Sequence, residues 1–192
     1  MILASKSPRR KEILEGFGFN LEIVTKNIEE VSDRTGILDK IIDISRKKTI
    51  AVAEDFPQEF VVGADTVVEL NGEILGKPKN REHAYEMLKA LSGRKHRVIT
   101  AYTLICLNED IEILNYNMTD VYFKELTEEE INWYIDTEEP MDKAGAYGIQ
   151  QKGAIFVEKI DGDFFTVMGF PIGKFIKSLE EIGISLTDIE NI

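Results

Sequence analysis

The stretch EFVVGADTVVELNGEILGKP, from residue 59 to residue 78, constrains the fold more than any other part of the chain. Its β-patterned runs TVVEL and EIL flank Asn71-Gly72, a dipeptide that favours the type I′ turn of a two-strand hairpin. The apolar, β-rich run FVVGA leads into this hairpin. The pattern therefore predicts a buried strand that continues into an antiparallel hairpin.

Strand and helix patterns alternate along the rest of the 192 residues. Strands are predicted at 1–5, 21–25, 96–107 and 111–124, and as a pair, AIFVEKI and FFTVMGF, on either side of Asp161-Gly162. Helices are predicted from Pro8 to Phe17, over 37–54, from the Asn80 cap to Gly93, after the capping box of Thr127 and Glu130, and from Pro171 to Ile182. The interleaving predicts an α/β or mixed α+β fold, and the length fits one domain, with or without two lobes.

The charge balance excludes several classes of partner. A net charge of −12 argues against binding to nucleic acid or to an anionic membrane through a broad basic surface. No apolar run reaches the roughly 18 residues that a membrane-spanning helix needs, and the opening MIL is too short for a signal peptide. The single cysteine, Cys106, lies in the apolar run LICL and is expected to be a buried, inert thiol. Together these features predict a cytoplasmic protein.

Two basic clusters stand out in this acidic chain: KSPRRK at 6–11 and SRKK at 45–48. The first begins a predicted helix, with Ser7 as the N-cap, and puts Arg9 and Arg10 in the first turn. Cations are unfavourable there, because the N-terminal end of a helix is partially positive. A bound phosphate would make them favourable, whereas without a ligand the long side chains would extend into water. The segment alone does not separate these interpretations, and SRKK alone is better explained as a solvated helix face.

A candidate acid and a candidate lysine lie in the hairpin stretch. Asp65 follows FVVGA at the end of a buried strand, where small neighbours let other groups approach. Lys77, in LGKP on the return strand, is expected to face the same cleft. This placement favours a catalytic aspartate over a turn aspartate. Glu29 and Glu30 lie in a polar loop and matter only beside a phosphate, where carboxylates recruit Mg²⁺.

The loop DKAGAYGIQ, at 142–150, is rich in small residues that let a ligand approach the backbone. Gln150 offers a donor and an acceptor side by side, which match the edge of uracil or thymine. Tyr147 could stack on a base, although core packing is the usual role of a lone aromatic residue. His83 and His96 lack metal-ligand spacing and are expected to be surface or structural residues, and no zinc pattern, P-loop or dinucleotide fingerprint is present.

Taken in order, these segments resemble the Maf family of nucleoside triphosphate pyrophosphatases. The resemblance covers nearly the whole chain and is carried by LASKSPRR, GADTVV, GEILGKP, AYEMLKALSGRKHRVIT, DKAGAYGIQ and GFP. It implies an inosine triphosphatase-like fold, with a curved mixed sheet and two lobes around a deep cleft. It also implies Mg²⁺- or Mn²⁺-dependent cleavage of a nucleoside triphosphate to the monophosphate and pyrophosphate. A homodimer is a further expectation from the family.

The resemblance also assigns roles to individual residues. The branch of the family that acts on dTTP and UTP, rather than on 7-methyl-GTP, is marked by Arg9, Thr66 and Gln150. Asp65 matches the proton acceptor, and together with Glu30 it matches the acids on the metal side. The positions that match triphosphate-contacting residues are Ser5, Arg10, Lys48 and Lys77. A triphosphate at the first helix would then explain the cations in its first turn.

The sequence departs from the usual family pattern at a few positions. Gln151 stands where a glycine commonly follows GIQ, Thr49 stands where alanine commonly follows the lysine, and Thr166 and Met168 replace residues of an NVVG run. None of these is a predicted acid or cation, but they bear on the shape of the loop near the base. Two alternatives stay open: a pyrophosphatase for inosine or xanthosine triphosphates, and a non-enzymatic nucleotide-binding regulator of septum formation.

Overall fold

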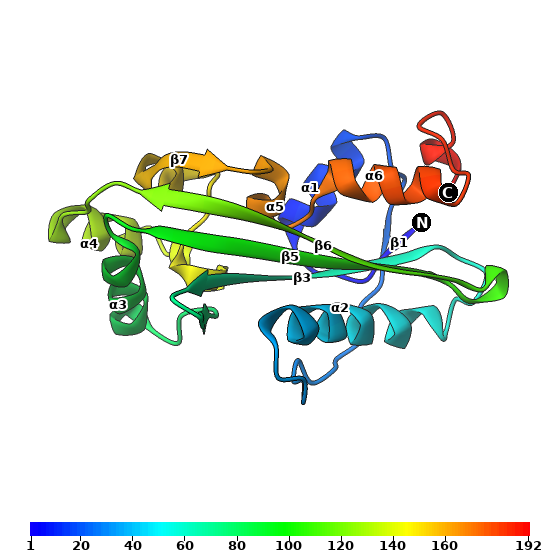
Figure 1. Ribbon diagram of the computed structural model, residues 1–192, viewed down its shortest axis with the longest axis horizontal. Helices are drawn as coiled ribbons and strands as arrows, with labels where there is room; N and C mark the ends of the chain where they lie inside the picture. Colours follow the sequence, from blue (N-terminus) through cyan, green and yellow to red (C-terminus); the bar gives the residue numbers. More distant parts are fainter. The chain divides into compact units, whose positions relative to one another are not determined.

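Seven strands form one mixed sheet in the computed structural model, which describes residues 1–192 (Figure 1). The strands are β1 (Ile2–Leu3), β2 (Glu22–Ile23), β3 (Val61–Leu70), β4 (Glu73–Leu75), β5 (Lys95–Cys106), β6 (Ile111–Phe123) and β7 (Val157–Asp161). Their order is β2-β1-β3-β5-β6-β7, and β4 pairs with β3. β1 is parallel to β2 and β3, whereas the pairs β3–β4 and β6–β7 are antiparallel. The predicted mixed α/β class is therefore confirmed.

Helices connect these strands. The α-helices are α1 (Pro8–Gly16), α2 (Ile37–Ala53), α3 (Arg81–Leu91), α4 (Glu128–Asp136), α5 (Phe164–Met168) and α6 (Ile172–Glu181). The 3-10 helices are η1 (Leu107–Glu109), η2 (Glu139–Asp142), η3 (Ala144–Ala146), η4 (Gln151–Phe156) and η5 (Ile189–Asn191). None of these helices combines the length and the apolar character that crossing a membrane would require.

The chain forms two compact units. Unit 1 consists of Met1–Asp65, Thr100–Asn117 and Gly169–Ile192, and unit 2 consists of Thr66–Ile99 and Met118–Met168. The strands β3, β5 and β6 each contribute residues to both units. The single domain that the length predicts stays a prediction, as do the curved sheet, the cleft and the homodimer that the resemblance implies.

Unit 1 is built around the short strand β1, which lies between β2 and β3. Ile2 pairs with Val61, and Leu3 pairs with Val62. In Figure 1, α2 covers one side of these strands, and α1 and α6 lie on the other side. One buried cluster of this unit consists of Ile2, Ala4, Val52, Ala53, Val61 and Ile105. Burial on both sides explains why the chain begins with an apolar run, as continuous apolar segments are typical of covered parallel strands.

Unit 2 has a core of its own, in which α3 and α4 pack against each other. Its largest buried side chains include Leu88, Leu91, Phe123, Tyr134 and Phe156. The apolar positions of α3 recur at helical spacing, so one face of the helix is buried and the other carries charge. The sequence pattern therefore accounts for the packing of this helix.

The local turn and capping signals are confirmed. Asn71 and Gly72 have φ angles of 54° and 87°, the left-handed values that a type I′ hairpin turn requires. The Asn80 side chain accepts a hydrogen bond from a backbone N–H in the first turn of α3. Thr127 and Glu130 form the predicted capping box of α4. Each of these interactions spans three residues or fewer, which is why the sequence alone predicts them.

One predicted strand is wrong. The segment Phe164–Met168 forms helix α5, and β7 pairs with β6 instead. Asp163 provides the reason, because its Oδ2 atom accepts the backbone N–H of Thr166 at 2.7 Å and its hydroxyl at 2.6 Å. This aspartate caps the first turn of a helix. The apolar run FFTVM is too short for its periodicity to separate a helix from a strand.

Candidate active site

Lys48 brings the carboxylates of Asp65 and Glu30 together in unit 1. The lysine is on α2, and its Nζ atom lies 2.7 Å from Oδ1 of Asp65 and 3.1 Å from Oε1 of Glu30. The side chains of Asp65 and Lys48 are only 14% and 15% exposed, whereas that of Glu30 is 60% exposed. Because water screens the Asp65–Lys48 pair less than it screens a surface ion pair, their attraction is stronger. Three residues that the sequence assigns to the site are therefore brought together.

A close contact between α2 and β3 sets the position of Lys48. A Cβ atom on Gly63 would lie 2.3 Å from Oγ1 of Thr49, so only glycine fits at this point of β3. Thr49 is buried and donates to the carbonyl of Ser45 at 2.8 Å. Thr49, which stands where the family commonly has alanine, thus fills the space above Gly63. The close approach of helix and strand brings Lys48, the neighbour of Thr49, to Asp65.

Arg10, in the first turn of α1, is held from two directions. Its Nε atom donates to the carbonyl of Gly169 at 2.9 Å, and Nη1 donates to Oγ of Ser5 at 3.0 Å. Gly169 has a φ angle of 114°, which favours glycine. The next residue, Phe170, is buried against Phe175, with ring centroids 5.1 Å apart. The GFP motif therefore anchors the arginine, a role that the sequence does not predict.

The start of α1 has the composition that the sequence predicts. Pro8 occupies the first helical position, and no acidic residue lies in the first turn. Ser7 is the N-cap residue, but its side chain makes no capping hydrogen bond. Instead its backbone N–H donates to Oγ of Ser5 at 3.3 Å. The helix therefore begins with clustered cations and without the usual side-chain cap.

The electrostatics of Arg10 reflect this clustering. The pKa of the Arg10 guanidinium is lower than its ordinary value, mainly because the group is buried. The nearby charge of Arg9 lowers this pKa further, and the carboxylates of Asp65 and Glu30 partly oppose the effect. The arginine stays charged, because a guanidinium is not deprotonated in proteins. An anion beside Arg9 and Arg10 would offset both the loss of hydration and the mutual repulsion. This is the environment expected of a phosphate site.

The second basic cluster divides between the surface and the site. The Nε atom of Arg46 lies 2.6 Å from Oε1 of Glu112, and Nζ of Lys47 lies 2.8 Å from Oδ2 of Asp43. The Arg46–Glu112 pair is exposed and the Lys47–Asp43 pair is partly exposed, in line with the interpretation of SRKK as a solvated helix face. Lys48 alone among them contacts the Asp65 carboxylate.

The other predicted site residues, Thr66, Lys77 and Gln150, belong to unit 2. Thr66 is a half-buried residue of β3, and Lys77 is exposed just after β4. The carbonyl of Gly76 accepts the N–H of Gly145 at 3.0 Å. This bond places the glycine-rich loop beside the segment that carries Lys77.

The glycine-rich loop has a constrained backbone. Gly145 has a φ angle of 67°, and a Cβ atom there would lie 2.9 Å from Cγ2 of Val68. Gln151 also has a left-handed φ angle, 58°, which is costly for a residue with a side chain. The family commonly has glycine at this position, so the departure places a strained residue next to Gln150.

Tyr147 is a core residue of unit 2. It is 5% exposed, and its ring lies edge to face with those of His96 and Phe123, at centroid distances of 5.3 Å and 4.6 Å. Core packing, the usual role of a lone aromatic residue, is therefore confirmed, and base stacking is not available to it. His96 is buried as well, in line with a structural role.

Residues 1–182 match the family model described as Maf-like protein. The chain belongs to the Maf family. One Maf relative, from Fusobacterium nucleatum subsp. nucleatum, is 53% identical over 192 residues, which are 100% of both chains. Relatives from Alkaliphilus oremlandii and Bacillus anthracis are 49% identical over 176 residues (91% of each chain) and 45% identical over 188 residues (97% of each chain). All three relatives bear the name dTTP/UTP pyrophosphatase.

Among solved structures, the Staphylococcus aureus Ham1 protein is 14% identical to this Maf protein, with a TM-score of 0.41. The match covers 64% of this chain and 70% of the other.

The acids of this Maf protein form a donor set that fits a divalent metal shared with phosphate. Glu30 and Asp65 contact the same Lys48 Nζ atom, so their carboxylates converge. No group of three or more His, Cys, Asp and Glu side chains forms a complete protein cage for a metal. Mg²⁺ is usually held by one or two carboxylates together with substrate phosphates and water. Two converging carboxylates beside clustered cations match this mode of binding.

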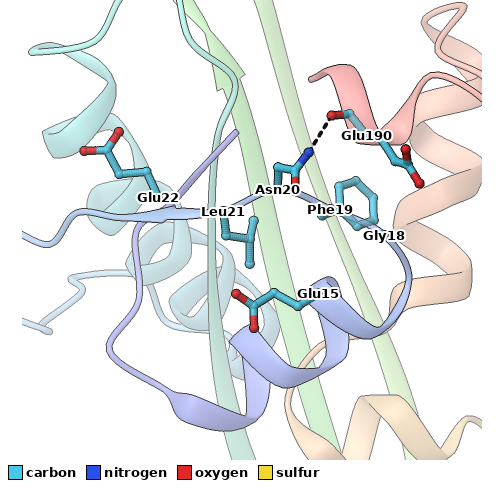
Figure 2. Close-up of a pocket in the computed structure, with 7 residues that line it drawn as sticks. All are labelled: Glu15, Gly18, Phe19, Asn20, Leu21, Glu22 and Glu190. Atoms are coloured by element: carbon cyan, nitrogen blue, oxygen red, sulfur yellow. Dashed lines mark hydrogen bonds between the residues drawn. The ribbon is translucent and has the colours of Figure 1, made fainter.

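An open pocket of about 840 Å³ in unit 1 is a separate feature (Figure 2). Its lining residues are Glu15, Gly18, Phe19, Asn20, Leu21, Glu22 and Glu190. It contains no predicted site residue, and its three carboxylates would repel a triphosphate. The pocket is therefore distinct from the predicted triphosphate site.

Proposed function

We propose that this Maf protein is a nucleoside triphosphate pyrophosphatase that converts dTTP and UTP to the monophosphate and pyrophosphate. The full-length identity to relatives named dTTP/UTP pyrophosphatase carries the proposal. The contacts among Asp65, Lys48 and Glu30, and the anchored Arg10, support it, since they combine an acid with clustered cations.

In the proposed reaction, water attacks the α-phosphorus and the bond to the bridging oxygen of pyrophosphate breaks. Asp65 orients the water and accepts its proton. Arg10, Lys48 and Lys77 neutralise the negative charge that develops on the leaving pyrophosphate, because phosphoryl-type transfer depends mainly on positioning and electrostatic stabilisation. Lys48 therefore exchanges its carboxylate partners, at least in part, for phosphate oxygens.

Glu30 and Asp65 are the residues that would hold Mg²⁺ or Mn²⁺. When bound, such an ion supplies positive charge to the phosphates and lowers the pKa of coordinated water. The anchoring of Arg10 by Ser5 and Gly169 serves the same end within the protein, because it fixes a cation before substrate arrives. A preset cation needs little reorganisation during the reaction.

We further propose that Gln150, with Arg9 and Thr66, selects the base. Uracil and thymine present an N–H flanked by carbonyl groups, which the amide of Gln150 can match as acceptor and donor. Cytosine presents an unprotonated ring nitrogen and an amino group instead. A mismatch leaves buried polar groups unpaired, at a cost of about 1–3 kcal/mol each.

Steady-state release of pyrophosphate from dTTP, UTP, CTP, GTP, ATP, ITP, XTP and 7-methyl-GTP tests the proposal. We expect dTTP and UTP to have the highest kcat/KM, and we expect Gln150→Ala to narrow their lead by harming these two substrates. Preference for 7-methyl-GTP would contradict the branch assignment. Preference for ITP or XTP would favour the inosine/xanthosine alternative, and binding without turnover of any nucleotide would favour a regulator.

A further inference from the structure

A buried pair, His96 and Tyr147, holds the loop that carries Gln150. The Nε2 atom of His96 and the hydroxyl oxygen of Tyr147 are 2.7 Å apart. The two residues are 3% and 5% exposed, and both rings lie edge to face against Phe123. Tyr147 is three positions before Gln150, whereas His96 is on β5, 51 residues before Tyr147. The pair therefore ties the loop to a strand of unit 2.

Neither member of the pair carries a charge at neutral pH. Burial lowers the pKa of His96 to about 4 and raises the pKa of Tyr147, so the imidazole is neutral and the phenol keeps its proton. The Tyr147 hydroxyl donates to Nε2 when the imidazole proton is on Nδ1, and it accepts from Nε2 when the proton is there. Nδ1 has no hydrogen bond of good geometry. The Tyr147 hydroxyl is thus the partner whose hydrogen bond to this imidazole has good geometry.

The loop is also fixed on the other side of Gln150. The N–H of Gly148 donates to the hydroxyl of Tyr134 at 3.2 Å, and that hydroxyl donates to Glu139 Oε1 at 3.0 Å. The N–H of Gly153 donates to the same Glu139 oxygen at 3.3 Å. Gln150 therefore lies on a short segment that is bound to Tyr134 at one end and to Glu139 at the other, both in unit 2.

We propose that His96 is a positioning residue for pyrimidine recognition: through the hydroxyl of Tyr147 it fixes the loop that presents the Gln150 amide to the base. An amide distinguishes uracil from cytosine only when its oxygen and nitrogen are held in a set orientation. This inference rests on the proposed function, because it gives the His96–Tyr147 pair a role in choosing among nucleotides.

The test compares Tyr147→Phe, His96→Leu and the double variant with the wild type. Tyr147→Phe removes a single oxygen atom and keeps the ring, so it tests the inference even if His96→Leu does not fold. The matched control is Tyr102→Phe in unit 1, because the Tyr102 hydroxyl is also buried and lies 2.8 Å from Oγ of Ser178. For each protein the measurements are the melting temperature, kcat and KM for dTTP and CTP, and the affinity for pyrophosphate with Mg²⁺.

We expect Tyr147→Phe and His96→Leu each to lower the dTTP-to-CTP ratio of kcat/KM by about tenfold, the value of one lost hydrogen bond. The change should be mainly in the KM for dTTP. The double variant should be no worse than the more damaging single variant, because both remove the same interaction. Pyrophosphate has no base, so its affinity should not change, and Tyr102→Phe should lower the melting temperature without changing the ratio.

An unchanged ratio in Tyr147→Phe would overturn the inference while the wild-type preference for dTTP and UTP still stood. An equal fall in Tyr102→Phe would also overturn it, because the effect would then be general destabilisation. A wild-type enzyme without the pyrimidine preference would instead overturn the proposed function, and this inference with it.

Discussion

Lowering the pH from 7 to 5 should destabilise unit 2 through His96. Burial lowers the pKa of this histidine from 6.5 to about 4, an effect that the Arg94 backbone and Asp120 only partly oppose. At pH 5 the unfolded chain therefore binds a proton at His96 and the folded chain does not. The contribution of His96 to the free energy of unfolding is therefore fully present above pH 6.5 and is lost as the pH falls toward 4. Between pH 7 and pH 5, this difference in proton binding lowers the free energy of unfolding by about 2 kcal/mol.

Urea unfolding followed by the fluorescence of Trp133 measures this loss, since the only tryptophan of the chain lies on α4 in unit 2. The comparison is with His96→Gln, which lacks the titrating group, while Asp120 and the other acids titrate in both proteins. The variant is expected to be less stable at pH 7, so only the change with pH is compared. Between pH 7 and pH 5, the free energy of unfolding of the wild type should fall by about 2 kcal/mol more than that of the variant. An equal fall in the free energy of unfolding of both proteins would show that His96 is not held as a neutral, buried imidazole.

Three further predictions concern the site and its loop. Asp65→Asn should lower turnover at least about 100-fold, as expected for a removed general base; near-normal turnover of the folded variant would exclude Asp65 from the mechanism. In thermal melts, pyrophosphate with Mg²⁺ should raise the melting temperature of Arg10→Ala much less than that of the wild type. Without ligand, the free energy of unfolding of the variant should be about 1 kcal/mol lower, because the Gly169 carbonyl loses the hydrogen bond from Arg10. An unchanged ligand-induced shift would mean that Arg10 is structural only. Gln151→Gly should raise the free energy of unfolding by about 1 kcal/mol, and with it the midpoint of urea unfolding, because glycine adopts a left-handed φ angle without strain. A lower midpoint would show that Gln151 is not strained.

The Arg10 prediction shows where sequence reasoning alone leads to a different result. From the first turn of α1 alone, removal of a cation of the wrong sign should not weaken the free protein. The structure adds hydrogen bonds from Arg10 to Gly169 and Ser5, so its removal has a cost. The end of a buried strand already favoured a catalytic role for Asp65, whereas Arg10 and Lys48 were assigned to the site through the family resemblance.

Local chemistry in the sequence determined most of the elements. The turn at Asn71-Gly72 and the caps at Asn80 and Thr127 depend on groups within three residues of each other, so their signals are complete in the sequence. Helix α5 was missed because FFTVM has no distinguishing period, although Asp163 was present as its cap. Periodicity shows that a face is buried, but it does not show what covers that face.

The tertiary structure alone decided which distant residues meet. Arg10 is bound to a carbonyl 159 residues away, and Tyr147 is bound to a histidine 51 residues away. Lys48 reaches Asp65 because Gly63 has no side chain where the buried Thr49 packs. Such contacts depend on how whole elements pack, and packing sums many weak interactions between segments that no local pattern relates. The sequence therefore determined the chemical groups and the local elements, and the packing of those elements determined how the groups are held.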